Sequence, residues 1–512
     1  MNWDIQNSVV HNSFDYFEKT LITDNGFREY DCRWLLGKEI NPNGFFVLGR
    51  AYGTMARREL GEKRVIVGHD FRSYSQDLCR SFILGLISTG AHVIDIGLAL
   101  TPMVYFAQHH FQIRAAAMCT ASHNENGWTG LKLADGLSST FSSDEMRRFK
   151  EIAHAGDFER GKGVYESCGD LEEAYRQDIL RRADHGGRQR SSRLRKACKI
   201  VLAAGNGTAG RFAPKILEEL GCKVVPLDCA ADWDFPRFNP NPEDVSFLKE
   251  ISRVTLEEGA DIGIGLDGDG DRMGVIDDKG REIFSDKLGL LLARWLSKSH
   301  PNRKVVIDVK STGLFNDDPV LKKNGVRVVI WKTGHSFIKA KVEETNAIAG
   351  FEKSGHWFFN SPIGLGYDDA ILSSVQLLKM LDESDMPLSQ RVDDLPRTWQ
   401  SPTIGAYCPD DAKYEVVKQV TESYRQDQKN GTRIGGSCIK ELITLNGVRF
   451  VLKDDSWGLV RASSNKPSLI LVAESKVSEN QLKAIMDHIQ SRLDDSAEVG
   501  ERDQEMPPRS MP

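Results

Sequence analysis

The chain repeats one pattern of apolar and polar positions three times. Each copy has a short apolar run, a stretch with helical spacing, a glycine and a second short apolar run. Short continuous apolar runs are typical of strands covered on both faces, and a glycine after a helix suits its C-terminal stop. The copies span residues 64–95, 199–225 and 304–330. The pattern predicts three related α/β domains, each with a mixed sheet between helices.

The C-terminal part of the chain has a different pattern. Apolar runs at 448–452 and 469–472 predict strands on either side of a turn, and 479–487 predicts a helix. These elements suit a smaller α+β domain. From about Asp494 the chain is charged and ends in a proline-rich stretch, which predicts a disordered tail.

These patterns set the expected domain boundaries. The α/β domains are predicted at 1–170, 171–283 and 284–395, the α+β domain at 396–495, and the disordered tail at 496–512.

Composition narrows the class of protein. The 512 residues are 40% hydrophobic and 27% charged, as in an ordinary soluble protein. The net charge of −6 gives no reason to expect nucleic-acid binding. No apolar run reaches the roughly 18 residues of a membrane span, and the N-terminus lacks the pattern of a secretory signal. The 9 cysteines are scattered without a Cys-x-x-Cys pair, which argues against a disulfide framework or a zinc site. We expect a cytoplasmic protein with no nucleic-acid or membrane partner.

Ser122 is the first candidate for chemistry. It lies in the polar stretch 120–124, directly after the apolar run 115–119, and Lys132 follows ten residues later. A nucleophile at a strand end, held next to a cation, suits the transfer of an anionic group.

A second candidate is the acidic loop after the apolar run 262–266. Asp267, Asp269 and Asp271 alternate with glycines, so their carboxylates can turn toward one point and supply hard oxygen ligands for Mg²⁺. The adjacent Arg272 suits a phosphate oxygen. The alternative of an acidic surface loop is disfavoured because three like charges this close repel each other. An EF-hand loop would need glycine where Arg272 stands.

A glycine-rich turn, 205–210, carries the competing signal of a dinucleotide site. It matches G-x-G-x-x-G, follows a predicted strand and opens a predicted helix, and Asp228 ends the next strand. The alternative is a tight turn that needs small residues for packing. We favour the packing turn because the equivalent turns of the other two copies lack the fingerprint.

Four further polar clusters contain groups that bind anions or hydroxyls, and each has a plain structural alternative such as a polar turn or a buried network. The stretch 461–467 offers an arginine fork, hydroxyls and an amide to a dianion. The stretch 351–356 offers Glu, Ser and His to sugar hydroxyls. The stretch 331–335 ends a predicted strand, where ligands bind in open α/β sheets, and 27–33 groups two arginines with a tyrosine.

Four of these motifs, in this order, resemble those of the bacterial phosphomannomutase/phosphoglucomutase group of the alpha-D-phosphohexomutase superfamily. Residues 120–124 are similar to the family's phosphoserine loop, 267–272 to its metal loop, 352–356 to its sugar-binding loop and 458–463 to its phosphate-binding loop. The resemblance extends from about Phe27 to Asp495. The chain departs from the family where Lys353 replaces the usual Met or Gln, and also at Glu125, Lys466 and Trp34.

The resemblance implies four domains around a central cleft and a mutase that interconverts hexose 6-phosphate and hexose 1-phosphate, of mannose, glucose or both. Ser122 would carry the phosphoryl group, and hexose 1,6-bisphosphate would be the bound intermediate and activator. Mg²⁺ would be held by the phosphoserine oxygen with Asp267, Asp269 and Asp271.

The resemblance also implies roles for further residues. The catalytic set, besides Ser122, would be Lys132, Arg33, Arg272 and His335. The substrate-binding set would be Tyr30, Lys310, Glu352, Ser354, His356, Arg461, Ser463, Ser464 and Asn465. The partners expected are small hexose phosphates, and the chain is expected to be a monomer, with a dimer as the alternative.

Two other functions remain open from the residues themselves. A serine-dependent sugar phosphatase would share the serine and the metal without needing the sugar and phosphate loops. A dinucleotide- or sugar-phosphate-binding protein would rely on the 205–210 turn.

Overall fold

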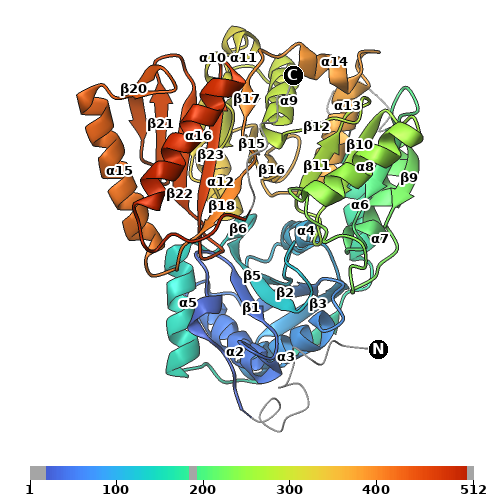
Figure 1. Ribbon diagram of the computed structural model, residues 1–512. Coiled ribbons are helices and arrows are strands. Elements are labelled where there is room, and N and C mark those ends of the chain that lie inside the picture. The colour runs from blue at the N-terminus through green and yellow to red at the C-terminus, as the bar shows by residue number, and fades with distance from the viewer. Residues whose placement is uncertain (1–18, 184–192, 504–512) are drawn as a thin grey trace. The chain divides into compact units, whose positions relative to one another are not determined.

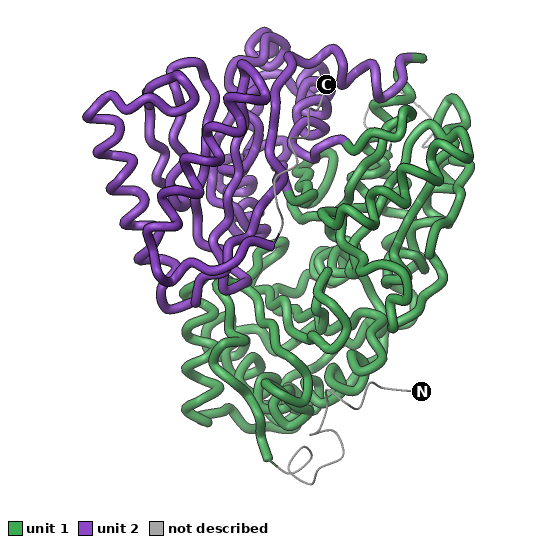
Figure 2. Tube along the Cα trace, in the orientation of Figure 1, with its two compact units in different colours: residues 1–282, 354–385 green, residues 283–353, 386–512 purple. Residues whose placement is uncertain are grey.

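The computed structural model describes residues 19–183 and 193–503, in two compact units. Unit 1 comprises the chain up to 282 together with 354–385, and unit 2 comprises 283–353 together with the chain from 386 onward (Figure 2). Within the described ranges, no helix combines the length and the apolar character that a membrane crossing requires.

The first sheet of unit 1 is mixed. Its strand order is β1-β5-β4-β2-β3-β7, with β6 paired to β5. Strands β4, β2, β3 and β7 are parallel, whereas β1 and β5 run antiparallel to their neighbours. Figure 1 shows α2 and α3 on one side of this sheet and α4 on the other. The elements are η2 (Asp24–Gly26), β1 (Cys32–Leu35), α2 (Pro42–Arg58), β2 (Arg64–His69), α3 (Ser75–Ser88), β3 (His92–Leu98), α4 (Thr101–Phe111), β4 (Ala116–Cys119), β5 (Trp128–Gly136), β6 (Ser139–Thr140), α5 (Ser143–Ala155) and β7 (Val164–Ser167).

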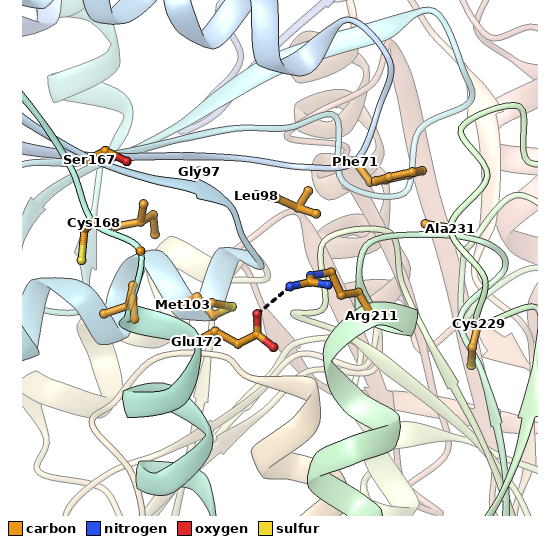
Figure 3. Close-up of a pocket in the computed structure, with 13 residues that line it drawn as sticks. Phe71, Gly97, Leu98, Met103, Ser167, Cys168, Glu172, Arg211, Cys229 and Ala231 are labelled. Atoms are coloured by element: carbon orange, nitrogen blue, oxygen red, sulfur yellow. Dashed lines mark hydrogen bonds and ion pairs between the residues drawn. The ribbon is translucent and has the colours of Figure 1, made fainter.

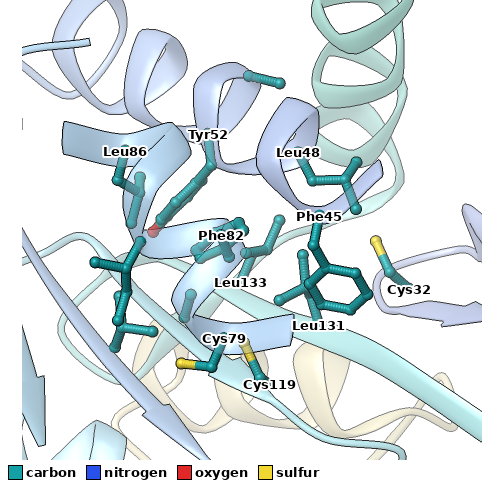
Figure 4. Packing of buried hydrophobic residues seen from close by; sticks show 14 of the residues in the cluster. Cys32, Phe45, Leu48, Tyr52, Cys79, Phe82, Leu86, Cys119, Leu131 and Leu133 are labelled. Atoms are coloured by element: carbon teal, nitrogen blue, oxygen red, sulfur yellow. The ribbon is translucent and has the colours of Figure 1, made fainter. Parts of the chain in front are cut away.

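The core of this domain lies between the sheet and helices α2 and α3. Phe45, Tyr52 and Phe82 from the helices pack against Leu131 and Leu133 of β5, all fully buried (Figure 4). The apolar runs seen in the sequence are these inward-facing positions, and their burial is the main force that holds helix to sheet.

The second sheet of unit 1 contains β11-β10-β8-β9, with β8, β9 and β10 parallel and β11 antiparallel. The segment 354–385 adds a strand and a helix to this unit, and β12 (Glu282–Ile283) marks the passage into unit 2. The elements are α6 (Leu171–Arg182), β8 (Lys199–Ala203), α7 (Ala209–Leu220), β9 (Lys223–Leu227), α8 (Val245–Glu257), β10 (Ile262–Leu266), β11 (Met273–Ile276), β16 (Trp357–Phe359) and α13 (Ala370–Leu381).

Unit 2 joins a parallel sheet, β14-β13-β15, to a C-terminal antiparallel sheet in which β23 pairs with β17, β18 and β22, and β21, β20 and β19 follow. The elements are α9 (Ser285–Ser299), β13 (Lys304–Asp308), α10 (Leu314–Asp317), α11 (Pro319–Lys323), β14 (Arg327–Trp331), α12 (His335–Glu344), β15 (Ala349–Phe351), α14 (Leu388–Asp393), β17 (Trp399–Gln400), β18 (Ile404–Tyr407), α15 (Lys413–Asn430), β19 (Arg433–Ile434), β20 (Ser437–Ile443), β21 (Val448–Leu452), β22 (Trp457–Ala462), β23 (Ser468–Ser475) and α16 (Glu479–Asp494).

The strand–helix–strand pattern is confirmed in all three copies, as β2-α3-β3, β8-α7-β9 and β13 to β14. Two expectations for the C-terminal part are wrong. The strands at 448–452 and 469–472 do not flank a turn, because β22 lies between them and pairs with both.

The disordered tail expected over 496–512 is also wrong for 496–503, and 504–512 lie outside the described residues. The N–H groups of Tyr407 and Asp503 donate to the carbonyl oxygens of Glu501 and Gly405, each at 2.9 Å. The tail thus runs antiparallel to β18 and satisfies backbone groups that an edge strand otherwise leaves unpaired.

Candidate functional site

Ser122 lies in the turn after β4, within unit 1. Its hydroxyl is buried and stands 3.4 Å from the Oδ2 atom of Asp267. Its φ angle is +53°, the left-handed region that side chains other than glycine rarely adopt. The Ser122 N–H donates to the Thr120 hydroxyl at 2.8 Å. This bond ties the turn to the residue that directly follows β4.

The three carboxylates after β10 lie in the same site and are fully buried. One oxygen from each of Asp267, Asp269 and Asp271 lies within 4.8 Å of the others. The Oδ1 atom of Asp267 accepts the N–H groups of Gly270, Asp271 and Arg272 at 3.0–3.2 Å, which folds the loop around this carboxylate. Its Oδ2 atom accepts the Arg272 Nε–H at 3.0 Å.

Lys132 of β5 is the cation that faces the loop. Its Nζ donates to Asp269 Oδ2 at 2.7 Å and to the Asp271 carboxylate. Burial alone would lower the pKa of Lys132. The attraction of Asp269 and Asp271 is stronger and raises this pKa above its ordinary value. Burial would raise the pKa of Asp269, but Lys132 lowers it below its ordinary value. Burial, with Asp271 and Asp269 nearby, raises the pKa of Asp267 to about 8.

This donor set fits a divalent metal ion. The Oδ1 atoms of Asp269 and Asp271 are buried without a hydrogen-bond partner, while their Oδ2 atoms are held by Lys132. Buried carboxylate oxygens that lack a partner are costly unless a cation satisfies them. Hard oxygen ligands of this kind suit Mg²⁺ or Ca²⁺ rather than a soft metal.

Arg33 of β1 and Tyr30, two residues before that strand, are both buried. Arg33 pairs with Gly130 of β5, two positions from Lys132 and so on the same face of the sheet. Its guanidinium donates to Asp31 Oδ2 at 3.1 Å and to the Cys32 carbonyl at 2.7 Å. A Cβ atom at Gly130 would stand 1.8 Å from that carbonyl, so this position needs glycine.

Ser354 and His356 lie in unit 1, beside the acidic loop. The Met273 N–H donates to the Gly355 carbonyl at 3.3 Å, and Arg272 and His356 form a β-bridge. The His356 Nδ1 atom stands 2.8 Å from Asp368 Oδ2 and 3.7 Å from Asp271 Oδ1. The structure therefore brings the second half of the predicted sugar loop to the predicted metal loop.

Unit 2 gathers another group of predicted residues at the carboxyl ends of its parallel strands. Lys310 follows β13, His335 follows β14, and Glu352 follows β15. Glu352 accepts the Gly334 N–H at 2.5 Å. Asp308, fully buried at the end of β13, accepts the Thr333 hydroxyl at 2.9 Å and the Ser311 hydroxyl at 2.6 Å, which ties these turns together.

The predicted phosphate loop joins β22 to β23, also in unit 2. Arg461 donates through Nε to Asn446 at 2.8 Å and through Nη2 to the Ser464 hydroxyl at 3.1 Å. The Ser463 hydroxyl accepts the N–H groups of Asn465 and Lys466, at 3.4 and 3.2 Å. Arginine, hydroxyl and amide groups thus converge in one tight turn.

Residues outside the motifs hold these loops in place, and no local sequence pattern predicts them. In unit 2, Arg449 donates to the carbonyls of Val309 and Ser311, each at 2.8 Å, on either side of Lys310. The Oδ1 atom of Asn446 accepts hydrogen bonds from Arg461 Nε and from the Thr333 N–H. In unit 1, Asp70 and Arg72 hold the Ser122 turn.

The glycine-rich turn after β8 is confirmed as a packing turn. The N–H groups of Asn206, Gly207 and Thr208 donate to the carbonyls of Asp228, Ala204 and Gly268, so none is left for a pyrophosphate. A Cβ atom at Gly210 would stand 2.3 Å from the Cys229 carbonyl.

A pocket of about 650 Å³ opens beside this turn, between the two sheets of unit 1. Phe71, Leu98 and Met103 line it, and an ion pair between Glu172 and Arg211 crosses it (Figure 3). None of the predicted site residues lines this pocket, so it is distinct from the Ser122 site.

The fold and the site define a class: a multidomain α/β protein in which a buried serine at a strand end lies beside a cluster of three carboxylates, two of which bind a buried lysine. Models of phosphoglucomutase/phosphomannomutase alpha/beta/alpha domains I, II and III match residues 24–160, 174–280 and 284–399, and the C-terminal domain model matches 407–491. The chain belongs to the phosphoglucomutase/phosphomannomutase family. The expected fold class, three related α/β domains and a C-terminal α+β domain, is confirmed.

Similar proteins carry the names of the same family. The chain is 31% identical over 472 residues to a phosphomannomutase/phosphoglucomutase of Pseudomonas putida, covering 92% of this chain and 96% of that one. It is 32% identical to the Pseudomonas aeruginosa protein of the same name, covering 90% and 96%. A phosphoglucomutase/phosphomannomutase family protein of Burkholderia thailandensis has a similar structure, with a TM-score of 0.81, 28% identity and coverage of 93% and 98%.

Proposed function

We propose that the chain is a phosphohexomutase that interconverts the 6-phosphate and the 1-phosphate of mannose, glucose or both. The observation that carries the proposal is the Ser122 hydroxyl, buried 3.4 Å from Asp267 in the same site as Lys132. A hydroxyl beside carboxylates that suit a metal, with an ammonium group fixed to the same carboxylate cluster, has the surroundings that phosphoryl transfer requires. The names of the Pseudomonas relatives support the hexose substrates.

In the proposed reaction, Ser122 rests as a phosphoserine. The bond from phosphorus to Ser122 Oγ breaks as a hydroxyl oxygen of the bound hexose monophosphate bonds to phosphorus. The sugar hydroxyl gives up its proton in this step, and the departing Ser122 oxygen takes up one. Lys132 and Arg33, as cations, would stabilise the charge of the transferring group or shuttle protons near it, and His335 is a second candidate for the proton transfer. The product is a hexose 1,6-bisphosphate, which also serves as activator. Transfer of its other phosphoryl group to Ser122 Oγ restores the phosphoserine and completes the interconversion.

Asp267, Asp269 and Asp271, with an oxygen of the phosphoserine, would hold Mg²⁺. When bound, Mg²⁺ would offset the charge of the transferring phosphoryl group. Arg272 holds Asp267 in place and offers its remaining N–H groups to a phosphate oxygen.

The other predicted residues would bind the substrate. Glu352 and Ser354 would accept and donate hydrogen bonds to the sugar hydroxyls, with Tyr30, Lys310 and His356 as further contacts. Arg461, Ser463, Ser464 and Asn465 would hold the phosphate that is not reacting. We propose that the protein acts as a monomer on small hexose phosphates.

The test is turnover of mannose 1-phosphate and glucose 1-phosphate, with a catalytic amount of glucose 1,6-bisphosphate. Wild type is expected to form the 6-phosphates without releasing phosphate. Ser122→Ala should fall to background, while Ser88→Ala, a helix serine that donates to the Gly85 carbonyl, should retain activity. An active Ser122→Ala enzyme would refute the proposal. Steady release of inorganic phosphate would identify a phosphatase instead.

A further inference from the structure

The loop between β2 and α3 holds the turn of Ser122. Strands β2 and β4 are parallel neighbours, with His69 opposite Cys119, so both end at the same edge of the sheet. Asp70 and Arg72 stand directly after β2 and are buried, with 3% and 4% of their surface exposed. They face the residues that follow β4.

Arg72 contacts three backbone carbonyls of the serine turn. Its Nη2 donates to the carbonyls of Ser122 at 3.0 Å and Asn124 at 2.5 Å, and its Nη1 donates to that of Glu125 at 3.2 Å. A planar guanidinium can reach several acceptors at fixed angles, which a lysine ammonium on a flexible stem cannot do. The guanidinium carbon Cζ of Arg72 stands 5.1 Å from the centre of the Phe235 ring, so the second domain adds a cation–π contact.

Asp70 holds the turn from its other side. Its Oδ2 atom accepts the Thr120 hydroxyl at 2.8 Å and the Ala121 N–H at 3.3 Å. The same atom stands 3.3 Å from Arg72 Nε, so the two side chains form a buried ion pair. Thr120 in turn accepts the Ser122 N–H at 2.8 Å.

Ser122 needs such support because of its left-handed backbone, with φ at +53°. A residue other than glycine keeps such a φ angle only when several surrounding contacts hold its backbone there. The φ angle sets the direction of the hydroxyl, and a displacement of about 1 Å of a reacting group is enough to slow a reaction severely. The contacts of Asp70 and Arg72 supply the constraint.

We propose that Asp70 and Arg72 are positioning residues that keep Ser122 left-handed and aimed at the phosphoryl group. This rests on the proposed function, in which Ser122 gives and receives that group. Neither residue touches the substrate; both act through the serine turn. The proposal predicts an effect on the rate of transfer rather than on the affinity for sugar phosphate.

The experiment compares Arg72→Met, Arg72→Lys and Asp70→Asn with Arg176→Met. Arg176 is a matched control because it is largely buried and pairs with Glu173 and Glu219 away from Ser122. Three quantities are measured in the full chain: kcat and KM for glucose 1-phosphate, the rate at which glucose 1,6-bisphosphate phosphorylates Ser122, and amide hydrogen exchange over 120–127.

Arg72→Met is expected to lower kcat and the phosphorylation rate by at least about tenfold, equivalent to about 1.4 kcal/mol, with KM nearly unchanged. Arg72→Lys should recover part of the rate, and exchange over 120–127 should accelerate. Arg176→Met should behave as wild type. Equal effects in Arg72→Met and Arg176→Met, or a change in KM alone, would overturn the proposal.

Two further comparisons keep the result decisive. If Arg72→Met does not fold, Arg72→Lys and Asp70→Asn decide the question by the same measurements, because each keeps the volume of the buried side chain. Ser122→Ala separates this proposal from the function on which it rests. An active Ser122→Ala enzyme refutes both, whereas an inactive one beside a fully active Arg72→Met enzyme refutes the positioning role alone.

Discussion

Lys132→Met should destabilise the metal-free protein strongly. The Lys132 ammonium donates to Asp269 and Asp271, and both carboxylates are fully buried. Methionine fills nearly the same volume without charge. Arg272 then remains as the hydrogen-bonded cation of Asp267, and the other two carboxylates lose theirs.

The structure sets the expected magnitude. Removing one partner of a buried ion pair costs about 3–5 kcal/mol, because the remaining charge stays buried without compensation. For unit 1, which comprises 1–282 and 354–385 and contains this ion pair, this corresponds to a fall in Tm of roughly 5–8 °C. Lys150→Met is the control, because Lys150 pairs with Asp24 in a solvent-exposed ion pair. Such pairs contribute about 0–1 kcal/mol, so its transition should move by at most about 2 °C.

The assay is calorimetry of the full chain in a metal chelator, at several pH values. Without Lys132, the native pKa of Asp269 should rise above its unfolded value, because burial is then opposed by less attraction. The native state then binds a proton that the unfolded state releases, so the variant loses stability as pH rises. The deficit should therefore be larger at pH 8 than at pH 5. Saturating Mg²⁺ should restore about 2.7 kcal/mol at a hundred times its dissociation constant. A Lys132→Met transition within about 3 °C of Lys150→Met at pH 8 would refute the reasoning.

Three other substitutions test the cap of α13 and two positions of the predicted sugar loop. Asp369 caps α13 and accepts the Tyr175 hydroxyl at 2.8 Å, and burial raises its pKa to about 7. Because native Asp369 keeps its proton above the unfolded pKa of about 4, wild type loses stability as pH rises from there to 7. Asp369→Asn keeps the Oδ1 acceptor of the helix cap, places an NH₂ donor opposite the Tyr175 hydroxyl, which can accept, and does not titrate. Its Tm relative to wild type should therefore rise between pH 5 and pH 8, and a constant difference would contradict this. Gly355→Ala should raise KM and lower Tm, because φ is +96° and a Cβ atom would stand 2.5 Å from the Met273 carbonyl. Gly436→Ala is the control, because Gly436 has a similar φ of +89° but open space around the added Cβ atom. Equal losses of Tm in the two variants would show that backbone strain, and not the clash with Met273, is the cause. Lys353→Met should leave Tm unchanged or raise it by calorimetry at pH 7, because burial lowers the Lys353 pKa and its charged form is disfavoured. A clear loss of stability would show that its contact with the Phe284 ring, at 3.9 Å, outweighs the cost of burial.

The parts of the fold that could be predicted from sequence are those with a local pattern. Continuous apolar runs gave the parallel strands because such strands are covered on both faces. The acidic loop was recognisable because its carboxylates and glycines are neighbours in sequence. Strand β22 was missed because its residues, among them Arg461, were assigned to the phosphate loop, although it pairs along its length with β21 and β23. The ordered segment 496–503 was missed because a charged composition says nothing of backbone pairing, which here is with β18.

Three aspartates that hold loops share a position in the fold. Asp70, Asp267 and Asp308 each stand at or directly after the end of a strand, and each is buried. Asp267 folds its own loop, whereas Asp70 and Asp308 accept donors from turns that follow neighbouring strands. A carboxylate has several acceptor positions and no donor, so one side chain at a sheet edge can fix several turns at once. Its partners are adjacent only after parallel strands have aligned, so the signal lies in the topology rather than in the spacing. A buried aspartate at the carboxyl end of a predicted parallel strand is therefore a reason to look for a second turn that it holds, even where no catalytic motif contains it.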